Sequence, residues 1–404
     1  MKNNIIVLFA ALFAANIVTF AQGVDSLEYR RSSIYSLMIN HSKLKFAKEI
    51  GDAFVKMPVP DKYNDHNLSV KIVTSDDEKH LSDNTRITEF LDRNYVASRL
   101  VGRWFNRNIF NGQCDMELVK SRGLYNASEF DKELARQSTR GIAMLEDAGE
   151  DLINNTFVLA NDIRYIDKAK GSKTAGGFLK VLGAVAAAYT GNDFLEDLGN
   201  TAGSLTETYK GFSVKIKSYL YQLVWDEAVV ADFYRNGYAS KPDSVKKAYF
   251  DSHRSSFKLK YVGMQESSGS NTSFLGINEE QPQKMVRKAC QRALDENVAN
   301  LQKNFEQFKV RVPLTKIEPL QAQIGMKEGI SEASRFEVLE VQKDEKGKTT
   351  YKRVGVISPV SGEIWDNRYM AVEEGAVGAK LGATTFKKVS GKDFYPGMLI
   401  REIK

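Results

Sequence analysis

The stretch Arg136–Asp167 reads RQSTRGIAMLEDAGEDLINNTFVLANDIRYID and decides the fold of this chain. Its first half repeats apolar residues at three- and four-residue steps, which is typical of one face of an amphipathic helix. These residues are Ile142, Leu145, Ala148, Leu152 and Ile153. In its second half, residues 156–160 form a continuous apolar run rich in β-formers, which indicates a strand buried on both faces. A helix that leads into a central strand predicts a layered domain of helices and sheet.

Patterns on both sides of this stretch predict a mixed α/β (α+β) fold. Apolar runs and alternations predict strands, and apolar residues at helical spacing predict helices. The elements expected are strands over 34–39, 116–119, 212–225 and 257–264, a loop over 265–276, and helices over 43–56, 86–110, 128–138 and 282–308. From residue 324 onward, several short strands separated by turns such as Pro396-Gly397 indicate a small β-barrel.

The length of 404 residues accommodates two or three domains of about 100–200 residues each. Pro313 and Pro319 follow the last predicted helix and are interpreted as a domain boundary. We therefore expect a mixed α/β domain at 22–318, with a Gly/Ala-rich insertion at 168–210, and a small β-barrel domain at 319–404.

Residues 1–21 are interpreted as a secretory signal peptide. Lys2 precedes an apolar segment over 5–18, and Thr19-Phe20-Ala21 ends in a small residue suited to cleavage. The alternative is an N-terminal membrane anchor, but the apolar segment is short for a span of roughly 20 residues, and no basic cluster follows it. We expect an exported protein of a bacterial envelope, either periplasmic or associated with the outer membrane.

Composition excludes some classes of function. The net charge of +6 is small for this length, and Lys and Arg alternate with Asp and Glu. The sequence therefore has no cluster of basic residues of the kind that binds a nucleic acid. Only Cys114 and Cys290 are present; export permits a disulfide between them, and two buried thiols are the alternative.

No catalytic, cofactor or metal motif is found in the sequence. Residues 170–174 (KGSKT) lack the spacing of a phosphate-binding loop, and the four histidines lack that of H-E-x-x-H. No serine lies in G-x-S-x-G. We therefore predict no catalytic residues, cofactor or metal. An enzyme is disfavoured, and an enzyme of unrecognised type is the third hypothesis for the function.

Residues 178–190 (FLKVLGAVAAAYT) are apolar and rich in small residues. They are too short to cross a bilayer as a helix. One interpretation is a closely packed helix, and the other is a segment that contacts a membrane surface or a partner. The interaction residues predicted here are Phe178, Leu179, Val181, Leu182, Val185 and Tyr189.

The order of the predicted elements resembles a known envelope domain. The early strand, the helix over 86–110, MELVKSRGLYNASEFD (116–131) and RGIAMLEDAG leading into NTFVLANDI (140–163) follow this order. It is similar to the α/β domain of the curli secretion channel lipoprotein, the TolB N-terminal domain and the middle domain of flagellar assembly protein T. The barrel, with DFYPGMLIREI (393–403), resembles the C-terminal domain of that flagellar protein. The lipidation Cys of the curli channel protein is absent, and the insertion 168–210 departs from the pattern.

This resemblance implies a non-enzymatic assembly, scaffold or secretion accessory that contacts other envelope proteins or copies of itself. The 168–210 segment and the exposed edge of the α/β sheet are the contacts expected, because unpaired strand edges accept partners. The alternative is an exported protein that binds a small molecule or glycan between its domains.

Overall fold

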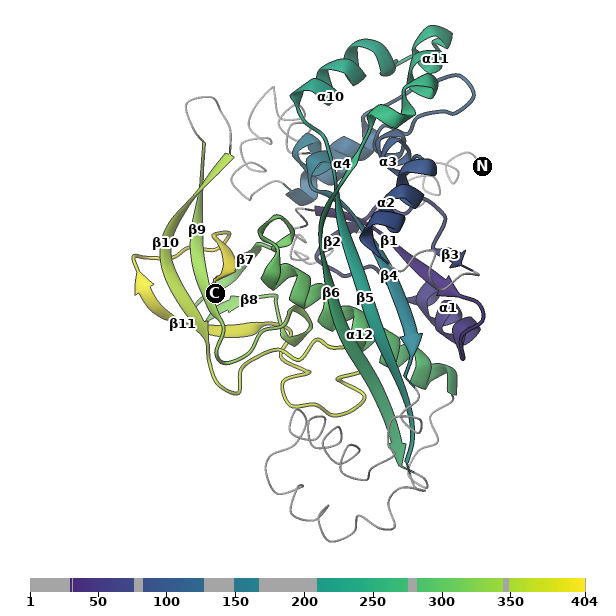
Figure 1. Ribbon diagram of the computed structural model, residues 1–404. Helices are drawn as coiled ribbons and strands as arrows, with labels where there is room; N and C mark the ends of the chain where they lie inside the picture. The colour runs from purple at the N-terminus through teal and green to yellow at the C-terminus, as the bar shows by residue number, and fades with distance from the viewer. Residues whose placement is uncertain are drawn as a thin grey trace, which may run out of the picture.

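The computed structural model describes residues 30, 32–75, 83–126, 149–166, 209–274, 282–343 and 349–403. The described chain contains helices and two β-sheets, which confirms the predicted mixed α/β (α+β) class (Figure 1). The strands of the first sheet are β1 (Ser32–His41), β2 (Tyr63–Asp65), β3 (Ile72–Ser75), β4 (Thr156–Tyr165), β5 (Tyr209–Leu223) and β6 (Leu259–Phe274). The α-helices are α1 (Ala47–Lys56), α2 (Asn84–Arg93), α3 (Val96–Trp104), α4 (Glu117–Asn126), α10 (Glu227–Asp232), α11 (Ser244–Ser252) and α12 (Pro282–Asn304).

The first sheet has the strand order β2-β1-β4-β5-β6, and β3 also pairs with β1. Strands β2, β3 and β4 run parallel to β1, whereas β5 is antiparallel to both β4 and β6. β5 and β6 form a long two-stranded ribbon that projects at the lower end of the molecule in Figure 1. Helices α10 and α11 join these two strands at the upper end.

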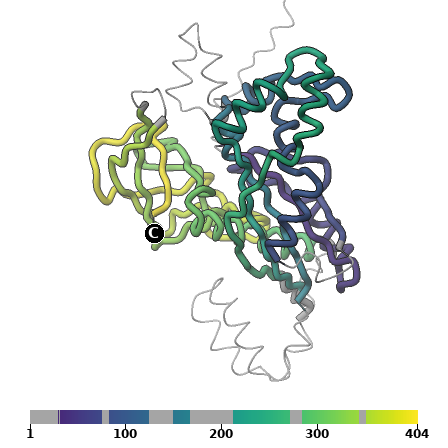
Figure 2. The backbone as a smooth tube through the Cα atoms, turned by 45° about the horizontal axis from the view of Figure 1, so that its top comes forward, coloured from purple at the N-terminus to yellow at the C-terminus, as the bar shows by residue number. Residues whose placement is uncertain are grey.

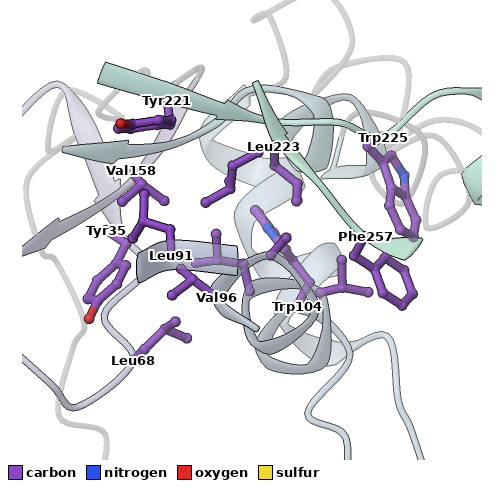
Figure 3. Close-up of a cluster of buried hydrophobic side chains, with 14 of the residues drawn as sticks. Tyr35, Leu68, Leu91, Val96, Trp104, Val158, Tyr221, Leu223, Trp225 and Phe257 are labelled. Atoms are coloured by element: carbon purple, nitrogen blue, oxygen red, sulfur yellow. The ribbon is translucent and has the colours of Figure 1, made fainter. Parts of the chain in front are cut away.

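Helices cover both faces of this sheet and create two separate cores (Figures 1 and 2). Helices α1 and α12 cover one face, and α2, α3 and α4 cover part of the other. In Figure 3, Leu91 and Val96 of the helices lie below Val158 and Leu223 of the strands. The sheet therefore serves as the shared middle layer of the domain.

Strand β4 is buried on both faces, as the sequence predicts. All residues from Thr156 to Ile163 are buried. Phe157 and Leu159 face α12, while Val158 and Ala160 face α2 and α3. Because both faces of the strand are apolar, its residues form a continuous hydrophobic run and do not alternate with polar ones.

Two glycines of β6 allow helix α12, and the Phe305 ring that follows it, to pack directly against the strand. A Cβ on Gly269 would lie 2.3 Å from the Ala289 carbonyl oxygen and 2.8 Å from the Ala293 Cβ. A Cβ on Gly263 would lie 2.1 Å from the Phe305 ring. These glycines are therefore required for close approach, not for an unusual backbone conformation.

A chain of buried polar side chains crosses the sheet beneath α12. Asn161 Nδ2 donates to Ser36 Oγ at 3.0 Å, and Ser218 Oγ donates to Asn161 Oδ1 at 2.6 Å. Asn297 of α12 continues the chain, donating to Ser218 Oγ at 2.7 Å and accepting from Ser267 Oγ at 2.5 Å. Since each member needs its partner inside an apolar core, the chain holds the helix in one position on the sheet.

The C-terminal strands close a six-stranded barrel in the order β10-β11-β8-β7-β12-β9. They are β7 (Val312–Ile317), β8 (Leu320–Ala322), β9 (Arg335–Lys343), β10 (Thr349–Pro359), β11 (Thr384–Gly391) and β12 (Leu399–Ile403). The barrel therefore begins at Val312, and the predicted boundary at residue 319 falls between its first two strands. Pro313 lies inside β7 opposite Leu399, so this proline does not separate the domains.

The structure corrects three local predictions. The helix expected over 86–110 is divided into α2 and α3 at Tyr95, whose φ of 50° lies in the left-handed region. Residues 116–119, expected as a strand, enter helix α4. The loop expected over 265–276 continues strand β6 as far as Phe274, because its small polar residues pair with β5. The predicted helix over 128–138 lies outside the described residues, and 149–154 are helical as expected.

The close packing of α12 predicts opposite effects for two glycine-to-alanine substitutions. Gly269→Ala should destabilise the protein by about 1–3 kcal/mol, because the new methyl group overlaps α12. Gly102→Ala in α3 should stabilise it by about 1 kcal/mol, since its Cβ would lie 3.9 Å from the nearest atom and alanine favours a helix. Urea unfolding of both variants measures the difference, and equal effects would contradict this account of the packing.

Candidate functional site

A buried histidine–aspartate pair lies at the carboxyl ends of two neighbouring parallel strands. His41 ends β1, and Asp162 lies on β4. His41 Nε2 lies 3.0 Å from Asp162 Oδ1, and Arg164 Nε donates to the same oxygen at 2.9 Å. Because ligand sites of open α/β sheets lie outside the carboxyl ends of parallel strands, this cluster is the first candidate site.

Hydrogen bonds keep the Asp162 carboxylate ionised despite its burial. Burial alone would raise its pKa, but bonds from His41 and Arg164 outweigh burial and lower the pKa. Arg164 Nη2 also donates to the second oxygen at 2.9 Å. Since both carboxylate oxygens are occupied, the cluster is better suited to fixing the strand ends than to transferring protons.

A charged, half-exposed surface adjoins this cluster on the same face of the sheet. Lys215 Nζ lies 2.5 Å from Glu266 Oε1, and Lys217 Nζ lies 3.6 Å from Glu266 Oε2. We call Arg164, Lys215, Lys217 and Glu266 the distal surface. These side chains belong to β4, β5 and β6, so the surface extends to the edge of the sheet.

Strand β6 forms that edge along its 16 residues. It pairs with β5 on one side, and the described residues provide no strand on its other side. We call this outer side the β6 edge. Helix α12 and the chain through Asn297 hold β6 in place, so the edge is long and pre-organised. Unpaired backbone groups in such an edge are a template for another strand.

A second histidine is buried at the other end of β1 and is interpreted as structural. Arg122 Nη1 donates to His66 Nδ1 at 2.6 Å, while His66 Nε2 donates to the Leu100 carbonyl at 2.9 Å. Burial and the Arg122 charge hold the His66 pKa well below its usual value, so the ring is neutral. The ring also stacks on Trp104. Both ring nitrogens of His66 are therefore engaged in hydrogen bonds within the fold.

Helix α12 also contacts the C-terminal barrel domain through ion pairs and hydrogen bonds. Glu374 of the barrel contacts both Lys288 and Arg292 of α12. Lys303 Nζ donates to the Gly329 carbonyl at 2.6 Å. These polar contacts attach the barrel domain directly to α12.

Asp295 is a buried carboxyl group at this interface. Burial raises its pKa to about 6, against the lowering effect of Lys327 and of the hydrogen bond from Gln291. Gln291 Nε2 donates to Asp295 Oδ1 at 2.9 Å, whereas no described residue forms a hydrogen bond with Gln291 Oε1 or Asp295 Oδ2. Two unpaired buried acceptors favour the protonated carboxyl, which supplies a donor.

The predicted disulfide between Cys114 and Cys290 does not form. Both cysteines are free and buried. Cys114 packs in the core beneath α3, whereas Cys290 lies on α12 against the opposite face of the sheet. The sheet separates the two thiols, and burial raises the pKa of each, so the alternative of two buried thiols applies.

The other predicted interaction residues lie outside the described residues. They are Phe178, Leu179, Val181, Leu182, Val185 and Tyr189.

The edge of the sheet was expected as a contact, but the length of this edge was not predicted, because the sequence SerSerGlySerAsn at 267–271 is typical of a loop. The signal available was the two-residue spacing of Ser267 and Gly269, both buried against α12. Nothing in the sequence indicated that His41 pairs with Asp162, because His41 only follows an apolar run.

Comparison with known protein families and with curated proteins finds no match for this chain. Within the part of the chain that the structure describes, no group of His, Cys, Asp and Glu could hold a metal ion. In the same described ranges, no helix has the length and apolar character needed to cross a membrane.

The buried carboxyl at the domain interface predicts a pH-dependent effect of Asp295→Asn. A pKa raised from 3.8 to about 6 means that the folded state holds the proton more tightly than the unfolded state. This contribution is complete below about pH 4 and is lost as the pH rises through about 6. At pH 7.5, Asp295→Asn should therefore stabilise the protein by roughly 1–3 kcal/mol, and at pH 4 by little.

Urea unfolding at both pH values measures this difference. Asp52→Asn is the control, because Asp52 pairs with Lys48 on the exposed surface of α1 and should change little. A destabilised Asp295→Asn at pH 7.5 would instead mean that the interface requires the carboxylate.

Proposed function

We propose that this protein is a non-enzymatic assembly, scaffold or secretion accessory that binds another polypeptide along the β6 edge. The partner is another envelope protein or a second copy of this chain. The observation that carries the proposal is the 16-residue edge strand, which the described residues leave unpaired on one side.

The edge suits strand addition because it is already ordered. Gly263 and Gly269 allow α12 to pack closely behind β6, and Asn297 bonds both the Ser267 side chain and the Gln265 carbonyl. A rigid edge loses little conformational entropy when a partner strand pairs with it. Main-chain hydrogen bonds would then supply affinity, each contributing about 0.5–1.5 kcal/mol net.

The distal surface would supply specificity beside this edge. Lys215 and Lys217 share the single carboxylate of Glu266, so the surface has excess positive charge. A partner strand flanked by acidic residues would therefore be favoured over one flanked by basic residues.

The proposal extends to where the protein acts. The signal-peptide pattern at residues 1–21 supports export, and the predicted element order, apart from the strand at 116–119, supports kinship with envelope assembly domains. We therefore propose a periplasmic or outer-membrane-associated protein. The segment 168–210 lies almost wholly outside the described residues and stays a proposed second contact, on the strength of its apolar, small-residue sequence alone.

A site-specific photo-crosslinker tests the β6 edge in cells that produce the protein. Placed at Ser268, which is exposed on β6, it should give one discrete adduct. Placed at the exposed Ser252 at the end of α11, it should give none. Light scattering of the mature protein, with and without residues 168–210, then shows whether the partner is a second copy.

Lysine substitution provides a matched test of the same edge. Ser270→Lys places a charge beside the edge and should abolish the adduct formed at Ser268, and Ser268→Lys with Ser270→Lys should abolish the oligomer, because lysines block pairing on natural edge strands. Ser252→Lys with Ser255→Lys on the remote surface is the control. A protein that is monomeric throughout and gives no adduct at Ser268 would contradict the proposal.

A further inference from the structure

Three large apolar side chains project into solvent at the end of the molecule opposite the β5–β6 ribbon. Phe110 is 84% exposed and Ile109 68% exposed, both in the loop between α3 and α4. Val245, in the first turn of α11, is 77% exposed. We call these three residues the apolar tip. Loop and helix lie together at the upper end of the molecule in Figure 1.

Hydrogen bonds hold the loop of the apolar tip in one conformation. Asn108 Oδ1 accepts from the backbone N–H of Phe110 at 2.8 Å and of Asn111 at 3.2 Å. The Asn111 carbonyl accepts from the Asp243 N–H at 3.1 Å, which joins the loop to α11. The apolar side chains are therefore presented by a fixed turn, and their exposure does not result from a loose loop.

A glycine brings this loop against helix α11. Gly112 has a φ of +77°, and a Cβ there would lie 2.7 Å from the Lys247 Cβ. The backbone thus passes directly over Lys247, so the apolar and basic residues form one continuous surface.

Positive charge is concentrated around the apolar tip. Residues 103–113 and 240–254 contain six Lys and Arg against two Asp, and Asp115 and Asp232 also accept hydrogen bonds from Asn106 and Tyr249 of these segments, which leaves a local excess of two positive charges. Asp243 is occupied in capping α11, where it accepts from two backbone N–H groups. The surface around the tip therefore has an excess of cations.

Three of these cations share one carboxylate. Arg107, Lys247 and Arg254 lie 3.3, 2.7 and 3.0 Å from the oxygens of Asp251. The Arg107 guanidinium also lies 4.0 Å above the Phe250 ring. One carboxylate cannot neutralise three cations, so the cluster keeps a net positive charge beside the apolar tip.

We propose that the apolar tip docks onto an anionic lipid surface. Phe110, Ile109 and Val245 would enter the boundary between headgroups and acyl chains, while the surrounding Lys and Arg contact lipid phosphates. A projecting tip suits a fluid bilayer, which yields around it, whereas a protein partner would need a matching pocket. The excess positive charge favours an anionic surface over a neutral one.

Vesicle flotation of the mature protein, which lacks residues 1–21, tests this proposal. Wild-type protein should float with vesicles of phosphatidylglycerol and phosphatidylcholine, and much less with phosphatidylcholine alone. Ile109→Ser with Phe110→Ser should lower the partition coefficient by roughly tenfold or more, because two large apolar side chains no longer enter the lipid. Lys241→Gln, at an exposed position near the tip, removes one positive charge and should lower the partition coefficient by roughly fivefold.

Val377→Ser is the matched control, because Val377 is equally exposed but belongs to the C-terminal barrel domain. It should leave flotation unchanged. Circular dichroism of the tip variants confirms that they are folded. Wild-type protein that floats with neither vesicle overturns the proposal and assigns the tip to a protein partner, and unchanged flotation of the Ile109/Phe110 variant overturns it as well.

Discussion

The close contact between helix α12 and the first sheet is the constraint on which the rest of the structure depends. Gly263 and Gly269 remove the side chains that would separate the two layers, and Asn297 bonds across the gap they leave. The sheet gains one of its two cores from this contact. The same helix then holds the barrel through Lys288, Arg292 and Lys303, so one element determines both packing and domain position.

The polar groups around α12 show two ways of placing polarity in a core. Asn297, Ser218 and Ser267 satisfy one another, so their burial fixes the position of the helix without a charge. Asp295, two residues before Asn297 on α12 and at the domain interface, is only partly satisfied, and burial raises its pKa. The first arrangement provides specificity, and the second makes the interface sensitive to pH because a charge there is poorly solvated.

The two surfaces proposed as contacts lie at opposite ends of the α/β domain (Figure 1). The ribbon of β5 and β6 offers backbone hydrogen-bonding groups, whereas the apolar tip offers side chains and positive charge. Surfaces of such different chemistry suit different occupants: an extended strand at one end and a lipid boundary at the other. Because β5 and β6 lead directly into α10 and α11, one continuous part of the chain links the two ends.

The sequence by itself determined the class of the fold, because the buried faces of helices and strands require apolar residues at regular spacings, and these spacings are visible in the sequence. The run of apolar residues in β4 predicted a doubly covered strand, and the spacing in α12 predicted the longest helix. It also predicted the barrel, from short strands separated by turns. Tertiary structure alone decided the remainder. Ser267 and Gly269 read as a loop until α12 is placed against them, and Cys114 and Cys290 could be paired until the sheet is seen to separate them. Ile109, Phe110 and Val245 belong to distant segments, and only folding brings them together. In each case the cause is a contact between residues far apart in the chain, which local periodicity cannot encode.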